Sequence, residues 1–474
     1  MDIPFEILDR EIARASGRSR AARASLERGE AVDYDPLDDE RRVSSRDTFL
    51  DLAPKPLPPR EPGQPIDHAA LLRPSDDHRV ALREWVFALT LDRVLWADSA
   101  RLATASRAAA ITIDRTDLGR LQLSPRELLH RVIAEPDPRR RRLLTEVLEQ
   151  GAFAVQDAAR IYTERRAEAA RRLPADLDRL EIPIDPLVVA GAPATTPTRA
   201  EALEAVADAV LRATEQLAPR AERSWDEAVD LGVGRAQAEG WPARLGSRWI
   251  EGLFHATSLT EGLRLDLGPL PRALGASSFA RALAAFGAAL ADADGPRGLP
   301  FTMASAPFDL RRARRSALFG SLVADPVFGR RMLGLGRDAA RDQARGVARS
   351  FTVAVRFAAA RALFRGLLSL PEGARAGRFE EITAAALGAP IPPALAGVVP
   401  RLAPADATAL LGLLLGALDR RALDERFDED WFRNPEAARA IREEDAAPAP
   451  FRRAPAALLT AGVAELARAL SDLG

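Results

Sequence analysis

The sequence contains no cysteine, a single lysine and few aromatic residues. The absence of cysteine excludes disulfides, thiol catalysis and thiolate metal sites, and we expect a cytoplasmic protein. Aromatic residues make up 5% of the chain and hydrophobic residues 47%, so the core must be built largely from Leu, Ala and Val. Lys55 is the single lysine among 67 basic residues. Arginine and alanine both have GC-rich codons, so a GC-rich bacterial genome explains this imbalance without any function.

A charge excess of one sign and a long apolar run are also missing. The net charge is -1, so no global field steers the chain toward nucleic acid or an anionic membrane, and we expect neither partner. The first 20 residues are charged and lack the apolar segment of a signal peptide. No run of about 18 uncharged apolar residues occurs. The most apolar segment, 407–418, is shorter than a membrane span and is predicted to be a buried helix.

The chain does contain helical periodicity, which begins at Ser75 and continues to the end of its 474 residues. Capping boxes at 124–127 and 198–201 each predict the start of a helix. Only two short runs, 109–113 and 187–190, have β character. We therefore predict an all-α fold, a large multi-helical body with or without a cleft, and at most two short strands.

Composition divides the chain into four predicted parts. Residues 1–74 form an N-terminal arm with a proline-rich strap at 53–65, which is either a ligand for a peptide-recognition domain or a segment lying across its own protein. Residues 75–180 form an N-terminal helical subdomain and residues 181–197 a proline-rich linker. Residues 198–474 form a C-terminal helical subdomain that contains a central helix at 277–293.

The central helix has two different faces. Ser277 is its predicted N-cap. Apolar residues recur every three or four positions and form one stripe, which consists of Phe279, Leu283, Phe286 and Leu290. The opposite face is small and carries one charge, so we expect it to be sheltered against other helices or a narrow cleft. This face consists of Ser277, Arg281, Ala284 and Ala288.

Motifs for metal, nucleophilic and phosphate chemistry are missing. The four histidines are His68, His78, His130 and His255, and they form neither an HExxH motif nor an i, i+4 pair. Glu251 and His255 share a helix face, but a catalytic zinc needs three protein ligands. We predict no metal and no cofactor, and we find neither a GxSxG motif nor a P-loop. The run Arg311–Arg315 either binds phosphate or carboxylate groups or forms a solvated, salt-bridged face.

The order of these parts resembles the M3 metallopeptidase family, the thimet oligopeptidase and oligoendopeptidase group. Members carry helices that read like HEFGHALH, where this chain reads SSFARALA at 277–284. Phe279, Ala282 and Leu283 match the framework of that motif. Ser277, Ser278 and Arg281 stand where the family has its first histidine, its glutamate and its second histidine. The resemblance therefore implies a large helical body with a central cleft, but without the zinc motif.

Other departures from the family pattern extend this conclusion. No glutamate lies between Glu261 and Glu372, so a downstream glutamate ligand is missing, and no histidine follows His255. Without zinc or a glutamate base, the peptidase reaction lacks its activated water. The resemblance thus implies a metal-free pseudo-peptidase that acts as a binding or scaffold protein for an unknown protein or peptide. The expected cleft residues are Glu251, His255, Ser277, Ser278, Arg281, Arg311, Arg312 and Arg315.

An enzyme of another class stays open as the alternative. A hydrolase, or another enzyme, could use carboxylates and arginine in the cleft, for example paired carboxylates as in sugar hydrolysis. The candidate residues for such a site are Glu251, His255, Glu261, Asp309 and Arg311. A pocket in which two of these groups converge would favour an enzyme over a binding protein.

Overall fold

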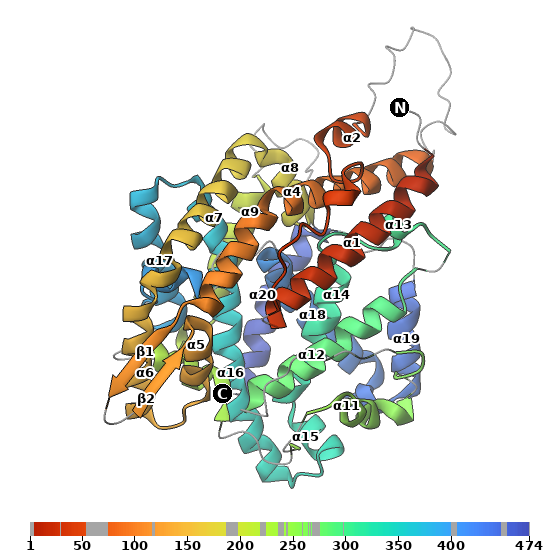
Figure 1. The fold of residues 1–474 in the computed structure, drawn as a ribbon. Helices are drawn as coiled ribbons and strands as arrows, with labels where there is room; N and C mark the ends of the chain where they lie inside the picture. Colours follow the sequence, from red (N-terminus) through yellow and green to blue (C-terminus); the bar gives the residue numbers. More distant parts are fainter. Residues whose placement is uncertain are drawn as a thin grey trace. The chain divides into compact units, whose positions relative to one another are not determined.

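The computed structural model describes residues 4–28, 30–53, 74–115, 119–185, 198–218, 224–235, 241–242, 245–257, 259–263, 265, 267, 275–296, 298–399, 405–446 and 453–473. Within them the fold is all-α with two small two-stranded sheets, which confirms the predicted class (Figure 1). No helix in this part of the chain has both the length and the apolar character that a membrane span requires.

The first half of the chain forms most of the short helices and both strands of the one antiparallel hairpin among the described residues. Its elements are α1 (Phe5–Arg28), α2 (Arg46–Asp51), α4 (Pro74–Ala108), β1 (Ile111–Arg115), β2 (Gly119–Leu123), α5 (Pro125–Ala134), α6 (Pro138–Gly151), α7 (Phe153–Arg172), α8 (Pro174–Glu181), β3 (Ile184–Asp185), α9 (Arg199–Ala213), α10 (Trp225–Val233) and α11 (Ser247–Phe254).

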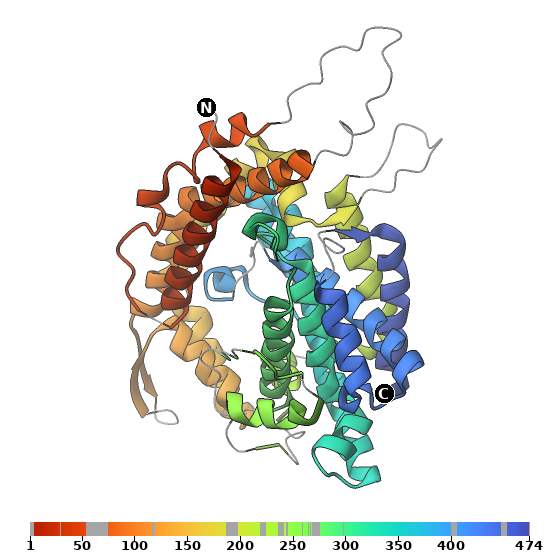
Figure 2. The ribbon, with the colours of Figure 1, turned by 90° about the vertical axis from the view of Figure 1, so that its right-hand side faces the viewer.

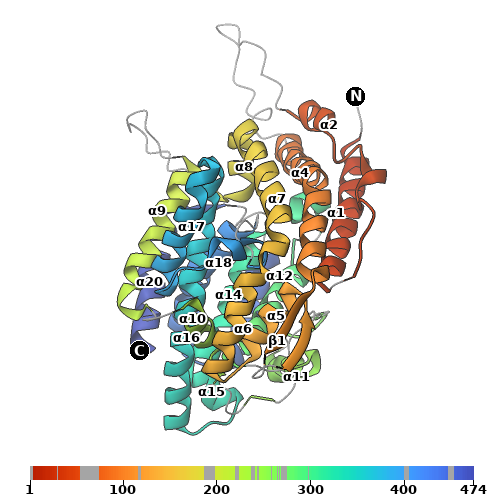
Figure 3. The same cartoon turned by 60° about the vertical axis from the view of Figure 1, so that its left-hand side comes forward.

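The second half contains the helices that surround the site discussed below. Its elements are α12 (Ala276–Ala293), α13 (Phe301–Ala304), α14 (Leu310–Ser321), η5 (Leu322–Ala324), α15 (Pro326–Met332), α16 (Arg337–Leu363), α17 (Glu372–Leu387), α18 (Asp406–Phe427), α19 (Pro435–Ala446), β4 (Ala454–Pro455) and α20 (Ala456–Leu473). In Figure 3, α9, α16, α17 and α20 run side by side along one part of the fold.

The contacts divide the chain into two compact units, at positions other than the predicted ones. Unit 1 comprises Met1–Thr104 and Pro296–Pro307, and unit 2 comprises Ala105–Gly295 and Phe308–Gly474. The predicted linker at 181–197 therefore falls within unit 2. Most of the predicted strap at 53–65 and the whole predicted strand at 187–190 lie outside the described residues.

Unit 1 is built on α1, which contacts both α4 and the distant segment 296–307. Arg23 of α1 forms an ion pair with Asp92 of α4. The carboxylate of Asp9 in α1 accepts hydrogen bonds from the backbone N–H of Phe301 at 2.9 Å and of Thr302 at 2.8 Å, at the start of α13. The first helix thus caps a helix that follows it by nearly three hundred residues in sequence.

The backbones of α12, α14 and α18 in unit 2 approach one another closely at glycines, and Figure 2 shows the three helices next to one another. A Cβ atom on Gly287 of α12 would lie 2.2 Å from the carbonyl oxygen of Arg315 in α14. A Cβ atom on Gly412 of α18 would lie 2.7 Å from the backbone of Ala313. Only glycine fits at these positions, so the three helices form a tightly packed layer.

The apolar stripe of α12 is buried, as predicted, and a cluster of aromatic rings surrounds it. Phe279 stacks on Trp241 with ring centroids 4.1 Å apart, and Phe286 stacks on Phe254 at 4.5 Å. Phe286 also packs edge-on against Phe319 of α14. A chain with few aromatic residues therefore concentrates many of them around one helix, which composition alone did not predict.

Several predicted helix boundaries need correction. The N-cap of α12 is Gly275, not Ser277. Position 275 must be glycine because a Cβ atom there would lie 2.5 Å from the carbonyl oxygen of Val233. Helical periodicity at 139–172 predicts one helix, but the structure divides this stretch into α6 and α7 at Ala152. Periodicity at 328–370 likewise predicts one long helix, but a turn at 333–336, in which Gly334 has a φ of 70°, separates α15 from α16.

Candidate functional site

Two arginines of the run Arg311–Arg315 in α14, Arg314 and Arg315, are engaged in a buried ion cluster. The side chain of Arg315 is 1% exposed, and its guanidinium donates to Asp445 at 3.0 Å, to Asp419 at 3.1 Å and to Glu444 at 2.7 Å. Burial alone would lower the pKa of Arg315, but the carboxylates of Asp445 and Asp419 outweigh this effect and raise it. Arg314 pairs with Asp419 and Glu444 in the same cluster. Arg315 therefore has its charge neutralised within the fold.

Arg311 and Arg312 differ from Arg315 in their exposure. Arg311 is partly buried and donates to the backbone oxygen of Asp445 at 3.0 Å and to Asp309 at 3.3 Å. Asp309 is the N-cap of α14 and accepts from the backbone N–H of Arg312. Arg312 is exposed and lies 3.5 Å from Asp292. Asp309 thus acts locally at the start of α14, while Arg311 and Arg312 connect this helix to α19 and α12.

The predicted small face of α12 is sheltered only in part. Ala288 is buried, and Ala284 lies against Gly320 of α14, where an added Cβ atom would be 3.3 Å from that of Ala284. Ser278 is also buried, whereas Ser277 is half-buried. Arg281 is exposed, so the expectation of a fully sheltered face is wrong at its N-terminal end. The long side chain of Arg281 reaches solvent, which avoids the cost of burying its charge.

Glu251, His255 and Glu261 form no site with one another. Glu251 is half-buried on α11, while His255 and Glu261 are exposed. Among the described residues, no group of three or more His, Asp or Glu side chains is arranged to hold a metal ion. None of the predicted cleft residues belongs to the cavity that the structure does contain.

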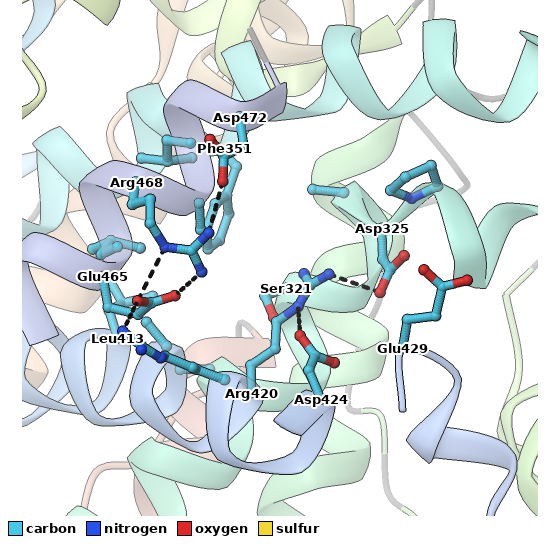
Figure 4. Close-up of a pocket in the computed structure, with 18 of the residues that line it drawn as sticks. Ser321, Asp325, Phe351, Leu413, Arg420, Asp424, Glu429, Glu465, Arg468 and Asp472 are labelled. Carbon is cyan, nitrogen blue, oxygen red and sulfur yellow. Dashed lines mark hydrogen bonds and ion pairs between the residues drawn. The ribbon is translucent and has the colours of Figure 1, made fainter. Parts of the chain in front are cut away.

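That cavity lies in unit 2 between α18, α20, α16 and the segment from the end of α14 to the start of α15 (Figure 4). Its volume is about 300 Å³, at the lower limit of typical ligand pockets. Its walls are mostly apolar, while the exposed residues Arg421, Glu429, Arg468 and Asp472 lie at the mouth. The larger apolar residues of the walls are Val327, Phe351, Leu413, Leu466 and Leu470.

One end of the cavity carries a balanced set of charges. Arg468 of α20 donates to Asp472 at 2.8 Å and to Glu465 at 3.2 Å, and Arg421 of α18 reaches Glu465 from the other side at 3.2 Å. The hydrogen bond from Arg468 is the main cause of a lowered pKa of the Glu465 carboxyl. The carboxylate of Glu465 is thus stabilised in its charged form.

The opposite end carries Arg420, Asp325, Asp424 and Glu429, as Figure 4 shows. Asp325 is fully satisfied because it accepts from the backbone N–H of Val327 at 2.7 Å and from Arg420 at 2.8 Å. Asp424 lies 3.8 Å from Arg420 through its Oδ2 atom, while its Oδ1 atom is buried without a hydrogen-bond partner. Burial is the main reason why the pKa of Asp424 is raised to about 6, and the charges of Asp325 and Glu429 add to the effect.

The backbone is strained where α18 ends, directly before Glu429. Asp428 has φ 67° and ψ 172°, a region that is almost restricted to glycine. Its carbonyl oxygen accepts from the N–H of Trp431, which is buried in the aromatic cluster. Strain of this kind costs about 1–3 kcal/mol and persists only where the surrounding packing imposes it. Here it holds Glu429 at the mouth of the cavity.

Sequence reasoning missed this cavity because its charged residues come from three separate segments. Asp325 precedes α15, Arg420 and Asp424 lie on α18, and Glu465 and Arg468 lie on α20. The local signals are pairs three or four residues apart, Arg420 with Asp424 on α18 and Arg468 with Glu465 and Asp472 on α20, and such spacings are common on exposed helices. The sequence matches no protein-family model and no curated protein.

Proposed function

We propose that this chain is a binding protein whose cavity between α15, α16, α18 and α20 holds a small, partly apolar organic molecule. The observation that carries the proposal is a cavity with mostly apolar walls that has the carboxylate of Asp424 at one end. The Asp424 side chain is 36% exposed and lies 3.8 Å from its nearest cation, Arg420, so a ligand that donates a hydrogen bond to the accessible part of this carboxylate would stabilise its charged form. Apolar walls with a few polar groups at defined positions are the usual construction of a ligand pocket.

We also propose that the chain descends from an M3 metallopeptidase, which would account for the resemblance. A helical body that has lost its zinc ligands can keep a role in binding, and the all-α fold is compatible with this origin. The cavity used here differs from the cleft that the resemblance implies, because Ser277, Ser278 and Arg281 do not line it. We therefore propose a metal-free helical binding protein, with its ligand in the cavity beside Asp424.

Titration with benzyl alcohol, followed by NMR, tests the proposal. We expect saturable shifts of resonances from the cavity walls. Ala417→Phe should abolish them because Ala417 lines the cavity and a benzyl side chain would fill its volume. Ala422→Phe is the matched control, since Ala422 is an exposed residue on the same helix. Failure to bind, or equal binding by the Ala417→Phe variant, would overturn the proposal.

An enzyme that uses Asp424 for proton transfer is the second candidate. The observation in its favour is the pKa of about 6, because a general acid or base is most effective when its pKa lies near the working pH. This reading keeps the predicted combination of carboxylates and arginine but assigns it to other residues. Hydrolysis of p-nitrophenyl acetate that is lost in Asp424→Asn and retained in Glu443→Gln, an exposed residue outside the cavity, would favour it. Equal rates in both variants would exclude this role for Asp424.

A further inference from the structure

The Asp424 end of the cavity has too few positive charges for its carboxylates. Asp325, Asp424 and Glu429 share one guanidinium, that of Arg420. At the other end, the two lining carboxylates Glu465 and Asp472 meet the guanidinium groups of Arg421 and Arg468. Arg421 also pairs with Glu425, which does not line the cavity. Among the lining residues, the negative excess therefore lies at the Asp424 end.

The two arginines that approach this excess are already engaged. Arg420 donates to Asp325 at 2.8 Å and lies 3.8 Å from Asp424. Arg468 is held by Glu465 and Asp472 at the opposite end. Neither cation is free to receive an anionic ligand without giving up a carboxylate partner, so the cavity disfavours carboxylates and phosphates.

We propose that the ligand is an amine with an apolar body, whose ammonium group binds between Asp424 and Glu429 while its body lies along the apolar walls. This inference rests on the proposed function, since it assigns the ligand class of the same cavity. An ammonium group carries three N–H donors and no acceptor, so it can donate to the accessible part of the Asp424 carboxylate, whose side chain is 36% exposed, and neutralise part of the excess. A charge-assisted hydrogen bond of this type is about twice as strong as a neutral one.

Binding of the amine requires the ionised form of Asp424. Four charged groups face this carboxyl: Arg420 from its own helix, Asp325 from the start of α15, Glu429 from the turn after α18, and Arg468 from α20. Since the free carboxyl has a pKa of about 6, it is ionised at pH 8 and mostly protonated at pH 5. The dissociation constant of the amine should therefore rise about tenfold between pH 8 and pH 5. A neutral ligand should show no such change.

The test compares three probes of similar shape: benzylamine, benzyl alcohol and benzoate. We expect benzylamine to bind at least tenfold more tightly than benzyl alcohol at pH 8, and benzoate to bind most weakly. Asp424→Asn should remove both the preference for the amine and its pH dependence while benzyl alcohol still binds. Glu443→Gln, an exposed residue on α19 outside the cavity, should keep the preference.

The outcomes separate this inference from the proposed function. Equal affinities of the wild type for amine and alcohol would overturn the amine assignment and leave the cavity as a binding site. A preference for the amine that persists in Asp424→Asn would overturn it as well. If neither probe binds to the wild type, the proposed function fails together with the inference.

Discussion

Two groups of charges share α18 and differ in how completely they are paired. Asp419 belongs to the buried cluster with Arg314, Arg315, Glu444 and Asp445, whose hydrogen bonds join α14, α18 and α19. The next residue, Arg420, belongs to the cavity, where three carboxylates share one guanidinium and one oxygen has no partner. The first group is closed and fixes helix packing. The second is open, costs stability, and is therefore the better candidate for a ligand site.

Breaking the closed cluster should have the largest effect. Arg315→Ala leaves the carboxylate of Asp445, which is 2% exposed, without its main partner. Removing one partner of a buried ion pair typically lowers the free energy of unfolding by about 3–5 kcal/mol. Urea denaturation should show this loss. Arg312→Ala, in the same helix but exposed, should cost less than about 0.5 kcal/mol. Similar losses in the free energy of unfolding for both variants would show that the buried cluster contributes no more than an exposed ion pair.

Separating α12 from α14 should have the next largest effect. Gly287→Ala places a Cβ atom where the carbonyl oxygen of Arg315 lies 2.2 Å away, so the two backbones must move apart. We expect a loss of about 1–3 kcal/mol in the free energy of unfolding, which a shifted thermal midpoint would report. Gly252→Ala in α11 is the control, because nothing lies within 4 Å of its added Cβ atom. The prediction fails if both variants melt like the wild type.

Removing the charge of Asp424 from the cavity should increase the free energy of unfolding. The pKa of Asp424 is raised in the folded state, so its contribution to stability is present below about pH 4 and is lost as the pH rises through about 6. Asp424→Asn removes the charged form, and we expect a gain of about 1–2 kcal/mol at pH 8 after allowance for solvent screening, and none at pH 4. Denaturation at both pH values measures this. A lower free energy of unfolding for Asp424→Asn at pH 8 would show that the charged form of Asp424 does not destabilise the protein.

Relieving the backbone at the mouth of the cavity should have the smallest effect. Asp428→Gly removes the strain at φ 67°, although glycine also loses more conformational entropy on folding. We expect a net gain of about 1 kcal/mol in the free energy of unfolding. Asp430→Gly, two residues further along at a negative φ, should instead destabilise. If the two variants change stability in the same direction, strain at Asp428 is not significant.

The sequence predicted the helices well where a local signal was strong. The capping boxes at Ser124 and Thr198 form as predicted, because both partners lie within four residues of each other. The buried stripe of α12 follows from helical periodicity in the same way. Helix breaks were harder to predict, since a glycine such as Gly334 can either end a helix at a positive φ or lie within one.

The site could not be predicted for a related reason. Whether an arginine is closed into a cluster or open to a ligand depends on which carboxylates face it from other helices. Arg315 and Arg312 belong to the same run, yet one is buried against α18 and α19 and the other is exposed. Asp424 has an ordinary sequence context on α18, and its raised pKa arises from burial and from Asp325 and Glu429.

The capping of α13 by Asp9 has a consequence for synthesis of the chain on the ribosome. Unit 1 consists of Met1–Thr104 and Pro296–Pro307. Its final segment is therefore translated after the first segment of unit 2, Ala105–Gly295. At typical translation rates of about 5–20 residues per second, the N-terminal helices wait roughly 10–40 s for that segment. During this interval the Asp9 carboxylate lacks the Phe301 and Thr302 amides. Unit 1 can thus be completed only after the intervening residues of unit 2, Ala105–Gly295, have been translated.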